Sequence, residues 1–306
     1  MSTENELKIV KRLTGVDDNQ IEVIEIGWTS RVYVIGNGKV VFKFPRNAKF
    51  REESKHEVTV LELLKGQRFS VSVPVLNWTS PDNSFFGYYG VEGKPLGEVI
   101  DGLSEQQKVE IGMQMGYFIK QLHGIKEYSD IKAQTLDEQT EEYQEWYRKG
   151  HNLLKEIFSE SELKTIDDFF ENKVPKSMTG SGELVFCHGD LDYNNTLINS
   201  NNQVGVIDFG DARLYDKSQD FRGMDDEILR DAMIKAYGSG EVISKAAAVA
   251  SSQMIDVLNL IYCIEQRDLE GINDYQKRIR AKILYGNKHY HQKMDKKYAP
   301  VVHDGH

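Results

Sequence analysis

Over the first ninety residues, hydrophobic and polar positions follow a pattern typical of short β-strands. Runs rich in β-branched and aromatic side chains are separated by turn residues. The Asn37-Gly38 pair lies between two of these runs, and such a pair favours a hairpin turn. One stretch, 52–65, has helical spacing instead and follows the third run. We therefore expect a five-stranded antiparallel sheet with one helix after the third strand, the strands covering residues 21–27, 31–35, 39–44, 71–80 and 84–93.

From about residue 96 onward, the apolar positions recur at helical spacing. Ser104 with Gln107, and Thr135 with Glu138, match the capping box that satisfies the first free N–H groups of a helix. The pattern predicts helices at 104–123, 136–157, 160–172 and several more within 224–295, with a small hairpin at 196–198 and 203–209.

Glycines and a proline interrupt the pattern at 87–96 and mark a lobe boundary. We expect an N-terminal lobe at 1–88, a hinge at 89–95 and a C-terminal lobe at 96–306. A sheet lobe joined to a helical lobe leaves a cleft, which is a favoured place for small ligands.

The composition narrows the class of protein. A chain of 306 residues with 40% hydrophobic and 28% charged residues has the composition of a globular protein. Its net charge of −10 argues against a nucleic-acid binder and is compatible with a cationic small substrate. The two cysteines form neither a disulfide framework nor a metal-binding pattern. Since the chain has neither a signal-peptide core nor an apolar run long enough to span a bilayer, we expect a cytoplasmic protein without membrane contact.

The stretch FCHGDLDYNN, residues 186–195, carries the clearest chemical pattern. His188-Gly-Asp190 is followed five residues later by Asn195, and Asp208 begins an Asp-Phe-Gly sequence after the next hairpin. This order is used by kinase-like folds, in which an aspartate orients the attacking hydroxyl. An asparagine and a second aspartate supply the oxygen ligands that Mg²⁺ prefers. His188 is expected to fix the loop by hydrogen bonding. Turn formation alone would also explain these residues, but both motifs occurring in order after a strand favours the chemical interpretation.

A second signal lies in the sheet lobe. A kinase-like site needs a cation near the phosphates, held by a carboxylate from a helix. Lys43 is on the third predicted strand, and Glu57 is on the inward stripe of the following helix, so we expect an ion pair. Two alternatives are a solvated Lys43 and a local capping box between Ser54 and Glu57. The loop Gly27-Trp-Thr-Ser30 has one glycine only, but its backbone and the Ser30 hydroxyl are placed to contact phosphate.

The stretches FCHGDLDYNNTLI and VGVIDFGDA resemble the catalytic core of the aminoglycoside phosphotransferase family, which includes choline, macrolide and sugar kinases. The resemblance implies an α+β, bilobal protein-kinase-like fold with Mg²⁺ and with ATP or GTP between the lobes. It assigns Asp190 as the catalytic aspartate, Asn195 and Asp208 as magnesium ligands, and Lys43 as the phosphate-binding lysine.

The resemblance also implies roles for one further segment and one further residue. The backbone from Tyr89 to Val91 resembles the hinge that reads the purine edge. Asp220 resembles a buried aspartate that braces the catalytic loop.

Departures from the protein-kinase pattern bear on the acceptor. Gly189 stands where protein kinases carry arginine, and no Ala-Pro-Glu follows the Asp-Phe-Gly sequence. We therefore expect a small-molecule hydroxyl acceptor rather than a protein. Acidic side chains attract polyamines, so the candidates for contact with a cationic acceptor are Asp192, Asp226, Glu227 and Asp231. A solvated helix face explains the run 225–231 equally well, and it is the better explanation for the acidic run 137–145.

The basic stretch 275–297 contains His289 and His291. Its apolar positions favour an amphipathic helix over a nucleic-acid contact, and the histidines have no metal-ligand spacing. We expect the last six residues to be a frayed tail.

Together these observations predict a Mg²⁺-dependent kinase, a monomer or weak dimer, that moves the γ-phosphate of ATP or GTP to a hydroxyl of an aminoglycoside-like molecule. The alternatives are a kinase of another metabolite or drug (a macrolide, choline or a sugar derivative), a non-catalytic nucleotide-binding regulator and a nucleic-acid adaptor. The presence of Lys43, Asp190, Asn195 and Asp208 together argues against the regulator.

Overall fold

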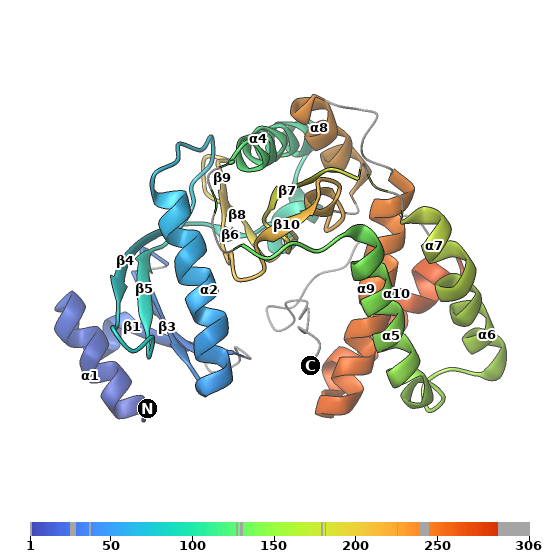
Figure 1. Cartoon of the computed structure of the whole chain (residues 1–306), viewed down its shortest axis with the longest axis horizontal. Helices are drawn as coiled ribbons and strands as arrows, with labels where there is room; N and C mark the ends of the chain where they lie inside the picture. Colours follow the sequence, from blue (N-terminus) through green and yellow to red (C-terminus); the bar gives the residue numbers. More distant parts are fainter. Residues whose placement is uncertain are drawn as a thin grey trace. The chain divides into compact units, whose positions relative to one another are not determined.

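The structure is a computed structural model, and it describes residues 2–24, 29–36, 38–126, 128, 131–178, 180, 182–224, 226–238 and 245–286 (Figure 1). The chain forms two compact units. Unit 1 comprises Met1–Leu96 and Asn195–Ala212, and unit 2 comprises Gly97–Asn194 and Arg213–His306.

The main sheet of unit 1 matches the expected architecture. Its strands, all antiparallel, are ordered β1-β2-β3-β5-β4 and comprise β1 (Ile21–Ile24), β2 (Ser30–Ile35), β3 (Val40–Pro45), β4 (Val75–Thr79) and β5 (Phe86–Tyr89). Helix α2 (Ala48–Lys65) follows β3. It begins four residues earlier than predicted because Asn47 caps it, accepting a hydrogen bond from the Phe50 N–H at 3.0 Å.

Helix α1 (Thr3–Thr14), which the sequence analysis did not predict, packs against this sheet (Figure 1). Val10 is buried in one cluster with Phe42 and Phe44 of β3. Because side chains alternate along a strand, Lys43 between them points to the opposite face. That face is covered by α2, so β3 presents its apolar residues to α1 and its lysine to α2.

A second, three-stranded sheet in unit 1 has the order β6-β8-β9. Its strands are β6 (Lys94–Pro95), β8 (Thr196–Ile198) and β9 (Val204–Val206). The hairpin β8–β9 was predicted at this position, but in a C-terminal lobe, whereas its contacts group it with the N-terminal sheet. Gly205 of β9 lies beside Ser72 in an isolated parallel bridge, which explains part of this grouping.

Unit 2 is mainly helical. After the short α3 (Leu96–Val99), its helices are α4 (Glu105–His123), α5 (Leu136–Leu154), α6 (Glu160–Asp168), α7 (Val174–Ser177), α8 (Glu227–Tyr237), α9 (Lys245–Gln266) and α10 (Leu269–Ile279). Single-turn π-helices follow α6 and α10, at Phe169–Lys173 and Arg280–Leu284. Strands β7 (Leu184–Cys187) and β10 (Arg213–Asp216) pair antiparallel. The capping boxes predicted for α4 and α5 are both present.

Two packing arrangements organise unit 2. Helices α5, α6, α9 and α10 enclose a large hydrophobic cluster. Helices α4 and α8 pack closely along each other (Figure 1), because Gly112 and Gly116 of α4 face the backbone of α8. A Cβ atom on Gly116 would lie 2.3 Å from the Met233 carbonyl oxygen, so this approach requires glycine.

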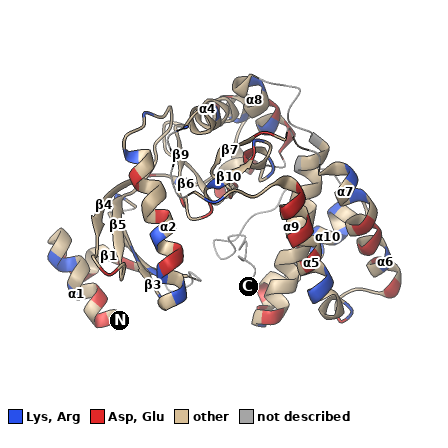
Figure 2. Ribbon diagram, in the orientation of Figure 1, with Lys and Arg blue, Asp and Glu red and all other residues tan. Residues whose placement is uncertain are grey.

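Two charged stretches singled out in the sequence, the acidic run 137–145 and the basic run 275–297, can be placed in the structure in whole or in part. Acidic side chains gather on the N-terminal half of α5, where most are exposed (Figure 2). In the basic stretch, Arg278 is buried and pairs with Asp256 and Asp274, so this charge stabilises the fold instead of facing solvent. His289, His291 and the last residues lie outside the described residues. Within the part of the chain that the structure describes, no helix is both long and apolar enough to cross a membrane.

Candidate active site

Three charged side chains of unit 1 form the centre of the candidate site. The Lys43 Nζ atom lies 2.7 Å and 2.9 Å from the two carboxylate oxygens of Glu57 and 3.0 Å from Asp208 Oδ1. Lys43 and Glu57 are nearly buried, with side chains 13% and 9% exposed, whereas Asp208 is 51% exposed. The ion pair predicted from the sequence is therefore present. The alternative capping box at Ser54 does not form, because that residue lies inside α2.

The electrostatics of this cluster follow from two carboxylates sharing one cation. Burial opposes the charge of Lys43, but the charges of Asp208 and Glu57 raise its pKa well above the ordinary value. Burial raises the pKa of Glu57 to about 7; Lys43 opposes this rise and Asp208 adds to it. Lys43 is thus held as a cation, with an excess of negative charge on its exposed side.

Asp208 is positioned by the turn that follows β9. Its φ of 66° is left-handed, a conformation that aspartate adopts more readily than most residues. The next residue, Phe209, is fully buried and anchors the turn, which closes through a hydrogen bond from the Ala212 N–H to the Phe209 carbonyl. His56 of α2 contacts the Ala212 carbonyl oxygen at 2.7 Å. The helix that supplies Glu57 therefore also holds the segment that supplies Asp208.

Asn195 stands at the same end of the β8–β9 hairpin as Asp208. The Ile207 N–H donates to the Asn195 carbonyl oxygen at 3.0 Å, so Asn195 and Asp208 lie one register step apart. One residue offers an amide oxygen and the other a half-exposed carboxylate, which is a donor set suited to Mg²⁺. The chemistry of Asn195 and Asp208 therefore fits Mg²⁺, the metal expected from the sequence.

In unit 2, the segment His188–Asp190 follows strand β7 and forms a tight turn. Gly189 has a φ of 87°, which favours glycine. The Asp190 N–H donates to His188 Nδ1 at 3.3 Å, and His188 is fully buried. Gln219 donates to the Gly189 carbonyl oxygen at 2.6 Å. His188 thus accepts a hydrogen bond within the loop, and Asp190 is partly exposed.

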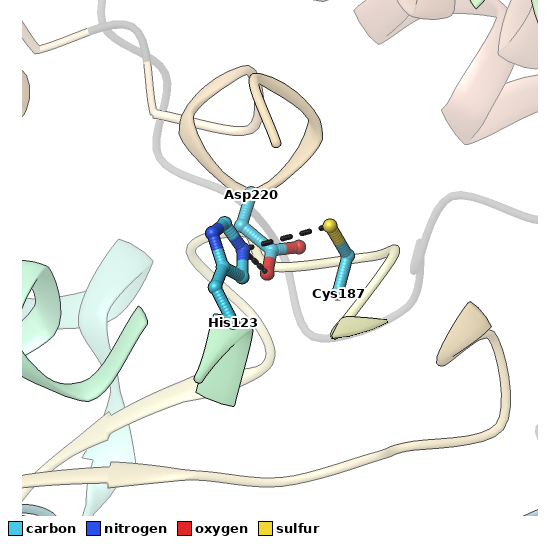
Figure 3. Close-up of side chains that lie close together, drawn as sticks. All are labelled: His123, Cys187 and Asp220. Atoms are coloured by element: carbon cyan, nitrogen blue, oxygen red, sulfur yellow. Dashed lines mark hydrogen bonds and ion pairs between the residues drawn. The ribbon is translucent and has the colours of Figure 1, made fainter. Parts of the chain in front are cut away.

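Asp220 binds the backbone of this loop. It is fully buried, and its carboxylate accepts hydrogen bonds from the N–H groups of His188 at 2.9 Å and Gly189 at 3.0 Å. His123, at the end of α4, contacts the same carboxylate at 3.1 Å (Figure 3). Burial opposes the charge of Asp220, but the contacts with His123 and His188 outweigh it and lower its pKa. Asp220 is therefore hydrogen-bonded to two backbone N–H groups of the loop that carries Asp190.

Cys187 lies 3.5 Å from the same His123 nitrogen, so His123, Cys187 and Asp220 converge (Figure 3). A metal would need the thiolate. Burial raises the pKa of Cys187 well above its ordinary value, and its sulfur also lies 3.8 Å from two backbone carbonyl oxygens. The chemistry of the three groups therefore fits a hydrogen-bonded cluster. His123 was missed from the sequence, where it reads only as the last residue of a helix.

The hinge and the phosphate loop are defined in part. Tyr89 ends β5 and is 49% exposed, while Val91 is buried. The intervening Gly90 donates its N–H to the Lys39 carbonyl oxygen at 2.9 Å. Ser30 is buried at the start of β2, opposite Pro45. Gly27 and Trp28 of the loop lie outside the described residues, so phosphate contact at Ser30 stays a prediction.

The four candidate acceptor residues have different surroundings. Asp192 is buried and accepts from the Asn194 N–H at 2.8 Å. Asp226 is buried, caps α8 and pairs with Lys108 of α4 at 2.7 Å, so its carboxylate already has a structural role. Glu227 is exposed in the first turn of α8, and Asp231 is partly exposed one turn later. Asp225 lies outside the described residues.

Solved structures with the same fold include aminoglycoside and macrolide phosphotransferases. The GDP and kanamycin complex of APH(2")-IIia matches with a TM-score of 0.76 at 19% identity, covering 94% of this chain and 100% of that one. The GDP complex of wild-type aminoglycoside 2'-phosphotransferase-IIIa matches with a TM-score of 0.75 at 18% identity, covering 93% and 99%. The apoenzyme of macrolide 2'-phosphotransferase MphH from Brachybacterium faecium matches with a TM-score of 0.66 at 16% identity, covering 90% and 98%. At these identities the likeness establishes a shared kinase-like fold.

The sequence comparisons are more specific about the family. No curated protein matches the chain significantly. Residues 20–239, however, match the profile of the phosphotransferase enzyme family, and this range contains Lys43, Glu57, Asp190, Asn195 and Asp208. The chain therefore belongs to the phosphotransferase enzyme family and is a small-molecule kinase.

Proposed function

We propose that this enzyme is a Mg²⁺-dependent phosphotransferase that moves the γ-phosphate of ATP or GTP to a hydroxyl of an aminoglycoside-like molecule and thereby confers antibiotic resistance. The observation that carries the proposal is the Lys43 cation held between Glu57 and Asp208. A fixed cation beside a half-exposed carboxylate suits a triphosphate with its metal. We place the enzyme in the cytoplasm, as a monomer or weak dimer.

Each functional side chain has a proposed task. Lys43 binds the phosphates of the nucleotide, and Glu57 keeps its ammonium group in place. Asn195 and Asp208 would hold Mg²⁺, which neutralises phosphate charge when bound. Asp190 orients the acceptor hydroxyl and takes its proton, so the rate enhancement comes from positioning and electrostatics.

The remaining assignments concern nucleotide recognition and domain limits. The Tyr89–Val91 backbone would read the purine, and Ser30 would contact phosphate. Residues 1–88 form the nucleotide-binding lobe in this proposal, 89–95 the hinge and 96–306 the lobe that carries the acceptor.

Several observations support a cationic acceptor. Neighbours with the same fold include complexes with kanamycin, gentamicin and streptomycin. The net charge of −10 attracts cations, and Glu227 and Asp231 present acidic groups on α8. Asp192 would contribute negative potential from a buried position, whereas Lys108 offsets the charge of Asp226. The alternative acceptor is a macrolide, which the fold match to MphH favours. Choline and sugar derivatives complete the set to be screened.

The test is nucleoside diphosphate release by the purified protein with Mg²⁺ and ATP or GTP, over a panel of aminoglycosides, macrolides, choline and sugars. We expect one aminoglycoside to stimulate release. Asp190→Ala should lower turnover by about 10²–10⁴-fold while nucleotide affinity is unchanged. Asp101→Ala removes an exposed carboxylate from unit 2 and should leave both unchanged.

The outcomes separate the hypotheses. Release stimulated only by a macrolide or another metabolite would replace the aminoglycoside with that acceptor. Loss of nucleotide binding in Asp190→Ala would contradict its proposed role at the acceptor hydroxyl. Nucleotide binding without release on any acceptor would favour the non-catalytic regulator.

A further inference from the structure

Helix α8 is attached to the catalytic loop at both of its ends. At its N-terminus, the Asp226 N–H donates to the Tyr193 hydroxyl at 2.8 Å. Tyr193 belongs to the loop between Asp190 and Asn195 and is buried. The loop thus supplies the acceptor for a backbone N–H group that the first turn of a helix leaves unsatisfied.

The second attachment starts at Tyr237, the last residue of α8. Its hydroxyl lies 3.0 Å from His123 Nδ1, and His123 Nε2 lies 3.1 Å from Asp220 Oδ2. A carboxylate oxygen only accepts, so Nε2 carries the proton in this contact. Asp220 in turn accepts from the two N–H groups that precede Asp190, those of His188 and Gly189. A continuous chain of hydrogen bonds therefore runs from the C-terminus of α8 to the loop.

The surroundings make both attachments rigid. The rings of His123, Tyr237 and Phe221 pack edge to face, with centroids 5.2–6.5 Å apart. Along its length α8 lies against α4, where glycines allow direct contact with its backbone. Lys108 of α4 fixes the N-terminal end by its ion pair with Asp226. The helix therefore cannot shift along its axis without straining a hydrogen bond at one end of the loop.

We propose that Tyr193, His123 and Tyr237 are positioning residues, through which helix α8 clamps the catalytic loop at two points and holds Asp190 in its reactive orientation. This inference rests on the proposed role of Asp190.

The test uses substitutions that remove single hydroxyl groups. Tyr193→Phe and Tyr237→Phe each break one attachment and keep the ring. Tyr275→Phe is the matched control, because its buried hydroxyl bonds Asn259 at 3.3 Å in the α9–α10 region. We expect each clamp variant to lower kcat about tenfold with unchanged nucleotide Kd, an effect of the size of one positioned hydrogen bond. The control should keep its kcat.

Amide hydrogen exchange gives a readout that is independent of turnover. Tyr237→Phe should accelerate exchange of the His188 and Gly189 amides, with unchanged exchange in strand β7, and Tyr193→Phe should accelerate that of Asp226. Unchanged exchange at these amides, or equal acceleration in Tyr275→Phe, would overturn the clamp.

The amide-exchange measurement also separates the proposed role of Asp190 from the proposed attachment of α8 to the catalytic loop. If Asp190→Ala keeps full turnover, the proposed role of Asp190 fails. The exchange measurements on Tyr193→Phe and Tyr237→Phe still decide whether the two attachments hold the loop.

Discussion

At the scale of single residues, the cluster of Lys43, Glu57 and Asp208 combines one cation with two carboxylates. Glu57 is buried, and its pKa of about 7 lies above the ordinary 4.5. The folded chain therefore binds more protons at this residue than the unfolded chain between those two values. Its contribution to stability is complete below pH 4.5 and is lost as the pH rises through about 7. Lys43 limits this loss by stabilising the ionised carboxylate.

Lys43→Met should therefore destabilise the protein in a pH-dependent way. At pH 8 the variant leaves the ionised Glu57 buried without its cation, at a cost of about 3 kcal/mol in the free energy of unfolding. At pH 5.5 Glu57 can be protonated in the fold, so the difference from the parent should shrink. Urea unfolding at the two pH values measures this change.

The double variant Lys43→Met with Glu57→Gln is the control for that prediction. It removes the buried charge along with its partner and should regain most of the stability at pH 8 while remaining inactive. A destabilisation of Lys43→Met that is the same at both pH values would show that lost packing, and not the Glu57 charge, is responsible.

At the scale of elements, the close contact of α4 with α8 supports a second prediction. Gly116→Ala places a methyl group 2.3 Å from the Met233 carbonyl oxygen and 2.8 Å from Ala236 Cβ. Relief requires the two helices to separate, which should cost about 1–3 kcal/mol of stability.

Gly102→Ala is the matched control in the same unit, since its added methyl group meets nothing within 4 Å. Thermal unfolding of both variants measures the difference. If the helices separate, Gly116→Ala should also accelerate amide exchange at both ends of α8. Equal melting temperatures for the two variants would show that α4 and α8 adapt without cost.

How well an element could be predicted depended on whether its signal was local. The sheet was predictable from the alternation of apolar and polar residues along its strands, and α2 from its stripe of apolar residues. The Lys43–Glu57 pair was predictable because the two residues are close in sequence, on a strand and the helix that follows it. Helix α1 was not, because part of its buried face is Glu6, which becomes internal only through Arg31 and Tyr33 of β2. His123 was not, because its partner Asp220 is 97 residues away in sequence. Such pairings arise from tertiary packing, and no local pattern reports them.

At the scale of the whole molecule, negative charge predominates, and some of the basic residues near the C-terminus form ion pairs inside the fold. Lys282 and Arg278 both pair with the buried Asp256. The surface therefore repels a polyanion such as RNA. A nucleotide is also an anion, and in the proposed site it would approach Asp208 and Glu57. Its binding should then depend on a cation to offset these carboxylates, with Lys43 supplying only part of the charge.

The last prediction concerns this dependence. A ligand that binds only the folded state stabilises it by about 2.7 kcal/mol at a hundredfold excess over Kd. We expect ADP or GDP with Mg²⁺ to raise the melting temperature clearly, and the same nucleotide in EDTA to raise it little. Asp208→Asn should lose most of the Mg²⁺-dependent part, because the amide is a weaker ligand, while Asp101→Asn should keep it. Equal shifts in Mg²⁺ and in EDTA would mean that Lys43 and backbone groups bind the nucleotide without a metal, and Asp208 would then serve only as a partner of Lys43.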